Sequence, residues 1–330
     1  MNTPTRAAFE VTKGARRVLT LSEAAVQQVL DPAELLAALD EGFRALEQGL
    51  VQAPPRPRLT LPDRGFSLTM PSWKPGGPLA VKVVNVFEGN PARGLPSHLA
   101  MILLFDADTG ATLCVMDGTC ITSLRTAAAA ALSVRLLARR DARVATLVGA
   151  GTQAREHLRV LGLVRGFERI QVWARQPAHA QALAALHPRA VAVADLEAAV
   201  RDADVVCLAT GSATPVIAAD WVRPGTHVTS VGFHPPAGEL PPALAQRHRV
   251  FVESLNAFEP APVGAGELAG LDGTRGATLG ALLLGRAAGR TADDQITVYK
   301  AMGHAMEDLV AATLAWESAV KKGAGAGMDW

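Results

Sequence analysis

The chain has 330 residues, of which 49% are hydrophobic, and carries 32 Lys and Arg against 31 Asp and Glu. The net charge of +1 excludes a global field that would attract nucleic acid or an anionic membrane, so neither is expected as a partner. Three cysteines without CxxC spacing disfavour a disulfide framework and a zinc site, and no other metal site is predicted. They favour a reducing, cytoplasmic location. The first twenty residues lack an apolar stretch of signal-peptide length, so the protein is expected to be unexported.

The opening third of the chain predicts an α+β domain. Ser22 and Asp31 are typical helix starts, and the second precedes "AELLAALDEGFRALEQGL", with apolar residues at helical spacing. Strand-like runs follow in "GFSLTM" and "LAVKVVNVF", then in the pair "AMILLFD" and "ATLCVMD", which residues 108–110 join as a hairpin turn. These runs predict an antiparallel or mixed sheet with helices against it.

The pattern changes from residue 122 onward. "TSLRTAAAAALSVRLLA" predicts a helix, and strands and helices then alternate from "RVATLVGAG" to "RVFVES", which predicts a parallel, doubly wound sheet. "ITVYKAMGHAMEDLVAATLAWESAV" predicts one long helix, and "KKGAGAGMDW" a loose tail. The expected domains are residues 1–123 with 306–330 for substrate binding and dimerisation, and residues 124–305 for a dinucleotide.

A glycine-rich loop, "LVGAGTQA", lies between a predicted strand and a predicted helix. Gly149 permits the tight turn, Gly151 lets a pyrophosphate approach the backbone, and Ala154 allows close helix packing. Thr152 and Gln153 begin the helix, whose amino end favours an anion. The loop predicts a bound dinucleotide; the alternative is a purely structural turn.

The second strand of this domain ends in "VWARQ", with Arg175 and no carboxylate. An acidic residue there would accept the ribose 2′-hydroxyl of NAD, whereas a guanidinium pairs with a 2′-phosphate. NADP(H) is therefore the preferred cofactor and NAD(H) a possible one. The alternative for Arg175 is a solvated or adenine-stacking side chain.

Ligands of open α/β sheets lie beyond the carboxyl ends of the strands. Gly149, Arg175 and Thr210 each follow a predicted strand, and His234 in "SVGFHPP" follows the fifth. These residues are therefore expected to share one edge of the sheet. The "ATGSATP" loop is predicted to pass near the nicotinamide half of the cofactor, or else to be a polar turn. The further expected cofactor-binding residues are Ala209, Thr210, Gly211, Gly232 and Gly303.

Cationic side chains in the first half suggest a small carboxylate substrate. In "LAVKVVNVF", Lys82 shares a strand face with Val84 and Val86, so its ammonium either snorkels at an edge or is held in a site with a compensating anion. Arg125 follows a plausible helix start, where its guanidinium and free N–H groups can converge on a carboxylate. "PPRPR" adds Arg56 and Arg58. Taken alone, each arginine is better interpreted as a solvated surface charge, and only the three cations together suggest the substrate site.

These residues resemble the ornithine cyclodeaminase and mu-crystallin family. The matching blocks, in family order, are "VKVVNVFEGNPARGLPSH", "LLFDADTGATLCVMDGTCITSLRTAA", "LVGAGTQA", "VWAR", "SVGFHPPAGEL" and "ITVYKAMGHAMEDLVAA". The resemblance implies a homodimer with a Rossmann domain for NAD(P) and a domain that carries the substrate site. It also implies that Arg56 and Arg125 bind the substrate α-carboxylate and that Lys82 lies beside the reacting carbon and nitrogen; Arg58 competes with Arg56 for its role.

The loop with His234 selects a branch of this family. Cyclodeaminase members carry an aspartate in the loop after this strand, whereas "GFHPPAGEL" has no acid until Glu239. A histidine can donate a proton but is not an anion that compensates a substrate ammonium. The sequence therefore predicts an NAD(P)H-dependent reductase of cyclic ketimines such as 1-pyrroline-2-carboxylate or 1-piperideine-2-carboxylate. Lys82, His234 or a water between them is the expected proton donor. The alternative for His234, equally weighted, is a loop residue without a catalytic role.

Three alternatives stay open. One is an open-chain imino-acid reductase or amino-acid dehydrogenase acting on iminosuccinate or alanine, in which Arg58 or His98 would suit a second carboxylate. Another is ornithine cyclodeamination despite the altered loop. The third is a non-enzymatic, NADPH-dependent binding protein like the crystallin.

Overall fold

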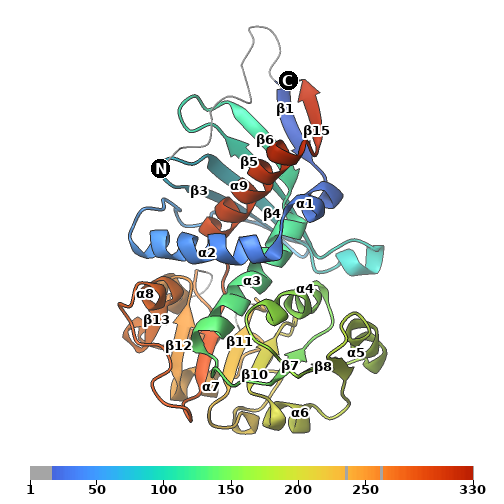
Figure 1. Ribbon diagram of the computed structural model, residues 1–330, viewed down its shortest axis with the longest axis vertical. Helices are drawn as coiled ribbons and strands as arrows, with labels where there is room; N and C mark the ends of the chain where they lie inside the picture. Colours follow the sequence, from blue (N-terminus) through green and yellow to red (C-terminus); the bar gives the residue numbers. More distant parts are fainter. Residues whose placement is uncertain (1–16, 235–236, 261–262, 330) are drawn as a thin grey trace. The chain divides into compact units, whose positions relative to one another are not determined.

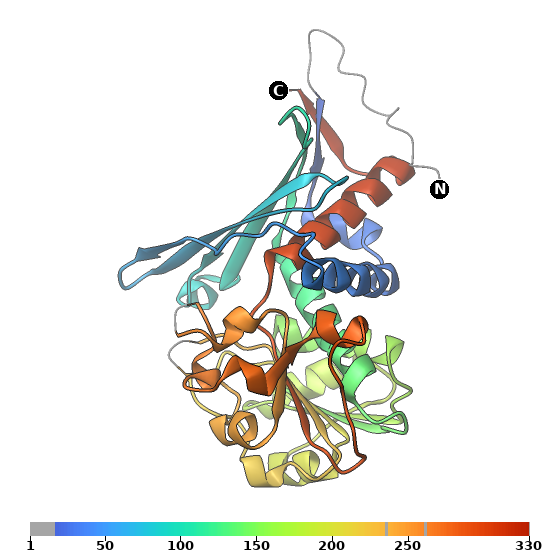
Figure 2. The same cartoon turned by 90° about the vertical axis from the view of Figure 1, so that its left-hand side faces the viewer.

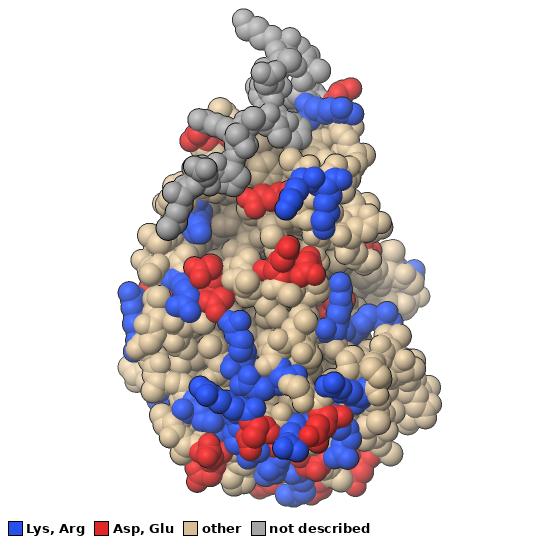
Figure 3. Space-filling model, viewed as in Figure 1, with Lys and Arg blue, Asp and Glu red and all other residues tan. Residues whose placement is uncertain are grey.

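A computed structural model describes residues 17–234, 237–260 and 263–329 (Figure 1). The expectation of no signal peptide falls largely on residues 1–16, outside the described residues. The chain divides into two compact units, one with residues up to 38, 50–122 and from 305 on, the other with 39–49 and 123–304. Acidic and basic side chains are interspersed on the face drawn in Figure 3.

The first unit contains a seven-stranded sheet among the described residues. Its neighbouring strands are antiparallel except for one parallel pair, β1 (Arg17–Leu21) with β6 (Thr112–Asp117). The predicted hairpin turn is present, with the Asp106 carboxylate accepting a hydrogen bond from the Thr109 N–H at 2.8 Å. In spatial order the strands are β15 (Ala326–Asp329), β1 (Arg17–Leu21), β6 (Thr112–Asp117), β5 (His98–Phe105), β4 (Leu79–Val86), β3 (Gly65–Trp73) and β2 (Arg58–Leu61).

Helices cover one face of this sheet. α1 (Glu23–Val29) packs on β6 and on α9 (Ala305–Lys322), and α9 packs on β3, β4 and β5 (Figure 2). Both predicted helix starts are confirmed, because Ser22 caps α1 and Asp31 caps α2 (Pro32–Glu47) through hydrogen bonds to backbone N–H groups. Along β4, alternate residues are buried, which puts Lys82 on the covered face.

Two expectations at the C-terminus were wrong. The predicted long helix is instead β14 (Thr297–Lys300) followed by α9. The strand is fully buried between β11 (His227–Ser230) and β12 (Arg249–Val252), and Gly303, with a left-handed φ of +72°, separates the two elements. The glycine-rich tail is not loose. It forms β15, paired antiparallel with β1, where backbone hydrogen bonds to an edge strand outweigh the low strand propensity of glycine.

The second unit is built on an eight-stranded sheet, counted over the described residues, in which every pairing is parallel. The predicted doubly wound fold class is confirmed, and β11 is the fifth of its strands along the chain. In spatial order the strands are β13 (Gly276–Thr278), β12 (Arg249–Val252), β14, β11 (His227–Ser230), β10 (Val205–Leu208), β7 (Val144–Val148), β8 (Arg169–Trp173) and β9 (Ala190–Ala192).

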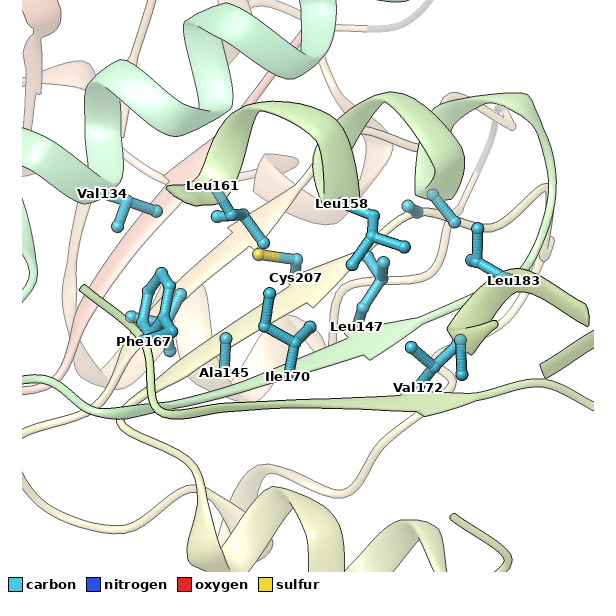
Figure 4. Close-up of a cluster of buried hydrophobic side chains, with 14 of the residues drawn as sticks. Val134, Ala145, Leu147, Leu158, Leu161, Phe167, Ile170, Val172, Leu183 and Cys207 are labelled. Atoms are coloured by element: carbon cyan, nitrogen blue, oxygen red, sulfur yellow. The ribbon is translucent and has the colours of Figure 1, made fainter. Parts of the chain in front are cut away.

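Helices of this unit alternate with its strands and pack on the sheet. Figure 4 shows Leu158 and Leu161 directed toward Leu147, Ile170 and Cys207 in one buried cluster, so apolar burial fixes the strand ends that carry the glycine loop. The helices are α3 (Thr119–Leu137), α4 (Thr152–Val160), α5 (Pro177–Ala184), α6 (Leu196–Asp202), α7 (Pro242–Arg247) and α8 (Leu279–Leu283). Short 3₁₀ turns of this unit occur at Leu161–Leu163, Ala219–Trp221, Leu255–Phe258, Gly266–Leu268 and Gly273–Arg275, and the first unit contains one at Asn90–Arg93.

α3 is unusually apolar. By length and mean hydropathy it is the one helix of the described ranges that would suit a membrane span. However, 67% of its most apolar window is buried inside the protein, which is typical of a core helix. Its alanine run, residues 127–131, is buried and allows close packing.

Candidate active site

The glycine loop connects β7 to α4. Gly149 has a φ of +123°, and a methyl group there would lie 2.4 Å from the Ala209 carbonyl oxygen, so only glycine fits this turn. At Gly151 a methyl group would meet no atom within 4 Å, which leaves open space in front of the amino end of α4. No side chain caps this end, and Ala154 is fully buried beneath it. The backbone N–H groups that begin with Thr152 and Gln153 therefore fit the pyrophosphate of a dinucleotide.

The loops that follow β10 and β11 are tied together by one buried carboxylate, Glu239. Its side chain is fully buried and accepts five hydrogen bonds of 2.6–3.1 Å. The donors are the backbone N–H groups of Thr210, Val231 and Gly232 and the hydroxyls of Thr210 and Ser230. Sequence reasoning noted Glu239 only as the next acid in the chain and did not find this role.

Close contact between these loops explains another glycine. A methyl group at Gly232 would lie 2.5 Å from the Thr210 carbonyl oxygen and 2.7 Å from Cδ of Glu239. At Gly211, by contrast, a methyl group would meet nothing within 4 Å. Gly232 is therefore required by packing, while Gly211 leaves space for a ligand.

A buried ion pair supports the same loops from β14. Lys300 Nζ lies 2.8 Å from Glu267 Oε1, and both side chains are almost inaccessible. The ammonium also donates to the Gly232 carbonyl oxygen at 2.5 Å and to the Ser230 hydroxyl at 3.3 Å. The sequence analysis did not single out Lys300. A lysine at the end of the apolar stretch "TVYK" could have indicated a buried ammonium that needs a carboxylate partner.

Arg125 lies in the second turn of α3 and is 5% exposed. The expectation that it directly follows the helix start was wrong, because α3 begins at Thr119 and the free N–H groups belong to the turn before Arg125. Gly303 packs against it: a methyl group at Gly303 would lie 2.8 Å from Nη1 of Arg125. The Glu253 carboxylate in turn accepts hydrogen bonds from the backbone N–H groups of Met302 and Gly303 at 3.0 and 3.1 Å. Glu253, which the sequence did not single out, thus fixes the loop that contacts Arg125.

In the first unit, Lys82 is held in an ion pair rather than snorkelling at an edge. Its Nζ lies 2.6 Å from Oδ2 of Asp308 on α9, and the two side chains are 1% and 2% exposed. Nζ also lies 3.5 Å from the Thr122 hydroxyl. The anion that compensates this ammonium is therefore a carboxylate of the chain itself.

The arginines of "PPRPR" differ in their surroundings. Arg56 is half-buried, whereas Arg58 is exposed and stacks over the Phe66 ring at 3.9 Å. His98 lies on the same face of the sheet as Lys82 by strand alternation. The pKa of His98 is lowered, first by desolvation and then by the positive charge of Lys82.

His234 and Arg175 follow β11 and β8. His234 is half-buried and forms an isolated antiparallel bridge with Ala237; the prolines between them lie outside the described residues. Arg175 is exposed, and its side chain makes no hydrogen bond or ion pair with any described residue. Nor does the described part of the chain group three or more His, Cys, Asp or Glu side chains as a metal site.

The structure brings the expected cofactor residues into two neighbourhoods of the second unit. The Ala209 carbonyl oxygen meets the glycine loop at Gly149, and Gly232 meets Thr210. The second neighbourhood is that of Gly303 and Arg125. Lys82 and Arg56 belong to the first unit. The second unit by itself provides an anion-receptive helix start and a buried guanidinium, and the first unit by itself provides a buried ammonium.

Comparisons with known proteins agree with this chemistry. The ornithine cyclodeaminase/mu-crystallin family model matches residues 16–323. A Δ1-pyrroline-2-carboxylate reductase of Paracoccus denitrificans is 38% identical over 83% of this chain and 90% of its own length.

Two solved structures are similar over almost the whole chain. The Δ1-pyrroline-2-carboxylate reductase of Thermococcus litoralis, in complex with NADH and L-proline, has a TM-score of 0.89 and 32% identity, and covers 94% of this chain and 100% of its own. An archaeal alanine dehydrogenase dimer with bound NAD has a TM-score of 0.88 and 30% identity, and the match covers 95% of this chain and 99% of the dehydrogenase chain. The predicted class, a nicotinamide-dependent oxidoreductase, is confirmed. The chain belongs to the ornithine cyclodeaminase/mu-crystallin family.

Proposed function

We propose that the chain reduces the C=N bond of a small cyclic ketimine carboxylate, such as 1-pyrroline-2-carboxylate or 1-piperideine-2-carboxylate, to the L-amino acid. The observation that carries this proposal is the state of Glu239. It is the first acid after β11, and its carboxylate is fully buried and occupied by five donors, so it is not available to assist amine chemistry. The likeness to two Δ1-pyrroline-2-carboxylate reductases supports the same reaction.

Each polar group has a role in this reduction. The reduced nicotinamide supplies the hydride to the imine carbon. Arg125 and Arg56 bind the substrate carboxylate, for which a guanidinium offers paired donors. Lys82 gives a proton to the substrate nitrogen, with His234 as a second proposed donor. Because Asp308 already neutralises the ammonium, Lys82 does not compete with the arginines for the substrate carboxylate.

NADPH is the proposed cofactor in preference to NADH. β8 ends without a carboxylate that would accept a ribose 2′-hydroxyl, and Arg175 follows it with an exposed guanidinium that has no partner among the described residues. A 2′-phosphate would pair with this guanidinium.

A homodimer is also part of the proposal. The sheet face opposite α9 carries apolar side chains in neighbouring strands, of which Met101 is exposed and Val81, Val83, Leu103 and Val115 are half-buried. Such a face is typical of one that a second copy of the chain covers. A cytoplasmic location is proposed because none of Cys114, Cys120 and Cys207 forms a disulfide bond.

A second candidate is the reduction of an open-chain imino acid. The likeness to the archaeal alanine dehydrogenase favours it, as does His98, which shares the sheet face of Lys82 and offers a further group for a second carboxylate.

The test is to follow NADPH and NADH oxidation with 1-pyrroline-2-carboxylate, 1-piperideine-2-carboxylate, iminosuccinate, and pyruvate with ammonia. Turnover of the cyclic substrates with kcat/KM at least tenfold above the open-chain ones supports the proposal. The reverse order would assign the second candidate. No turnover with any substrate overturns both, and conversion of ornithine to proline without added reductant would assign cyclodeamination.

A further inference from the structure

A pocket of about 220 Å³ opens beside the glycine loop, between the first turn of α4 and the length of α5. Its lining begins at Ala150, between the two glycines of the loop. Arg155 of α4 and His179 of α5 contribute the polar walls, and Ala182 and Leu183 the apolar part. The pocket therefore begins where the glycine loop is built to receive a pyrophosphate, and it continues toward α5.

The two polar walls are a guanidinium and an imidazole, and no acidic side chain lines the pocket beside them. Neither side chain makes a hydrogen bond or ion pair with a described residue, and no residue that lines the pocket is acidic. Arg159, one turn further along α4, differs because it lies 3.4 Å from Glu156. A pocket with unpaired donors and no carboxylate is suited to an anion.

The position relative to β8 indicates which anion. In a dinucleotide-binding fold the adenosine ribose lies at the end of the second strand, where its 2′-oxygen meets the following residues. Here these residues are Arg175 and the first turn of α5, which contains His179. A phosphomonoester carries a charge of about −1.5 to −2 at neutral pH, more than one guanidinium neutralises.

We propose that Arg155 and His179 form, in this pocket, a subsite for the 2′-phosphate of NADPH, and that Arg175, which follows β8 and does not line the pocket, adds a third donor from the neighbouring chain. The inference rests on the proposed function only in that the cofactor is a nicotinamide dinucleotide. Arg155 and His179 are then specificity-determining residues that favour a ribose 2′-phosphate over a 2′-hydroxyl, and neither takes part in hydride transfer.

The experiment measures binding of adenosine 2′,5′-bisphosphate and of 5′-AMP to the full chain by calorimetry, so no turnover is needed. Arg155→Ala and His179→Ala are each expected to weaken the bisphosphate about tenfold, the size of one charge-assisted hydrogen bond. Their affinity for 5′-AMP is expected to stay within about twofold. The matched control is Arg159→Ala, which removes the same charge from the same helix and should change neither affinity.

The possible outcomes distinguish failure of the proposed phosphate subsite from failure of the proposed reductase function. If Arg155→Ala and His179→Ala lose affinity equally for the bisphosphate and for 5′-AMP, the pocket binds adenine and the proposal is overturned. It is also overturned if the wild-type protein binds the two ligands with equal affinity. A loss of the same size in Arg159→Ala would reduce the effect to general electrostatics and also overturn it. Selective loss in a protein that turns over no imino acid would leave the subsite standing while the proposed reductase function fails.

Discussion

Lys82 on β4 and Asp308 on α9 form a buried ion pair, with Nζ and Oδ2 2.6 Å apart and both side chains at most 2% exposed. Asp308→Asn leaves the ammonium without its anion, which is expected to cost about 3–5 kcal/mol of unfolding free energy. Lys82→Ala is expected to lower kcat about 100-fold or more while cofactor affinity stays unchanged. Urea unfolding and steady-state kinetics measure the two effects.

The control for this pair is the double variant Lys82→Met with Asp308→Leu. Removing both charges together is expected to recover most of the stability without recovering turnover. Recovery of turnover in the double variant would contradict a role for Lys82 in proton transfer.

Glu239→Gln tests the carboxylate that ties the loops after β10 and β11. An amide oxygen accepts fewer of the five hydrogen bonds, and the amide NH₂ faces donors, so we expect a loss of about 2–4 kcal/mol in unfolding free energy and a raised KM for the cofactor. Calorimetry and kinetics measure both. Glu168→Gln, at an exposed ion pair with Arg143, is the control and should change neither.

Gly149→Ala tests the turn of the glycine loop. The new methyl group would lie 2.4 Å from the Ala209 carbonyl oxygen at a backbone φ that alanine rarely adopts, so cofactor affinity is expected to fall at least about 100-fold. Gly166→Ala, where a methyl group meets nothing within 4 Å, should bind the cofactor normally. Fluorescence titration with NADH compares the two variants.

Two buried histidines predict acid sensitivity. Burial lowers the pKa of His227 to about 3, with a further contribution from Arg290, and burial lowers that of His157 to about 4. Because the unfolded histidines bind protons near pH 6.5 and the native ones do not, the stabilisation is complete above that pH and falls as the pH decreases toward 4. Each histidine is expected to lower the free energy of unfolding by about 2 kcal/mol as the pH falls from 7 to 5.

Urea unfolding at several pH values measures this slope. His227→Gln should make it shallower by about half. An unchanged slope in this variant would show that His227 is not the group that titrates.

The proposed dimer predicts the effect of a charge on the open sheet face. Met101 is 52% exposed on β5, and Met101→Glu is expected to convert a dimer into a monomer because a buried unpaired carboxylate is costly. Light scattering after size-exclusion chromatography measures the mass. Leu186→Glu, with a leucine of 56% exposure in the second unit, should remain dimeric, and a monomeric wild type would refute the proposal.

Much of the second unit was predictable because its signals are local. Strand and helix periodicity alternate along the chain. The spacing of Gly149, Gly151 and Ala154 predicts the tight turn and the close packing of the following helix. The C-terminus was not predictable in this way. Thr297–Lys300 continues a helical pattern in sequence, yet its place between two parallel strands makes it a strand.

By itself, the sequence determined the family, the dinucleotide loop and the face of β4 on which Lys82 lies, because each depends on residues close together in the chain. Only the tertiary structure decided what compensates Lys82 and what Glu239 does. Asp308 reaches Lys82 through the packing of α9 on β4, and Glu239 receives donors from two loops that meet only when β10 and β11 pair. Partners of buried charges are chosen by three-dimensional packing, on which local spacing carries no information.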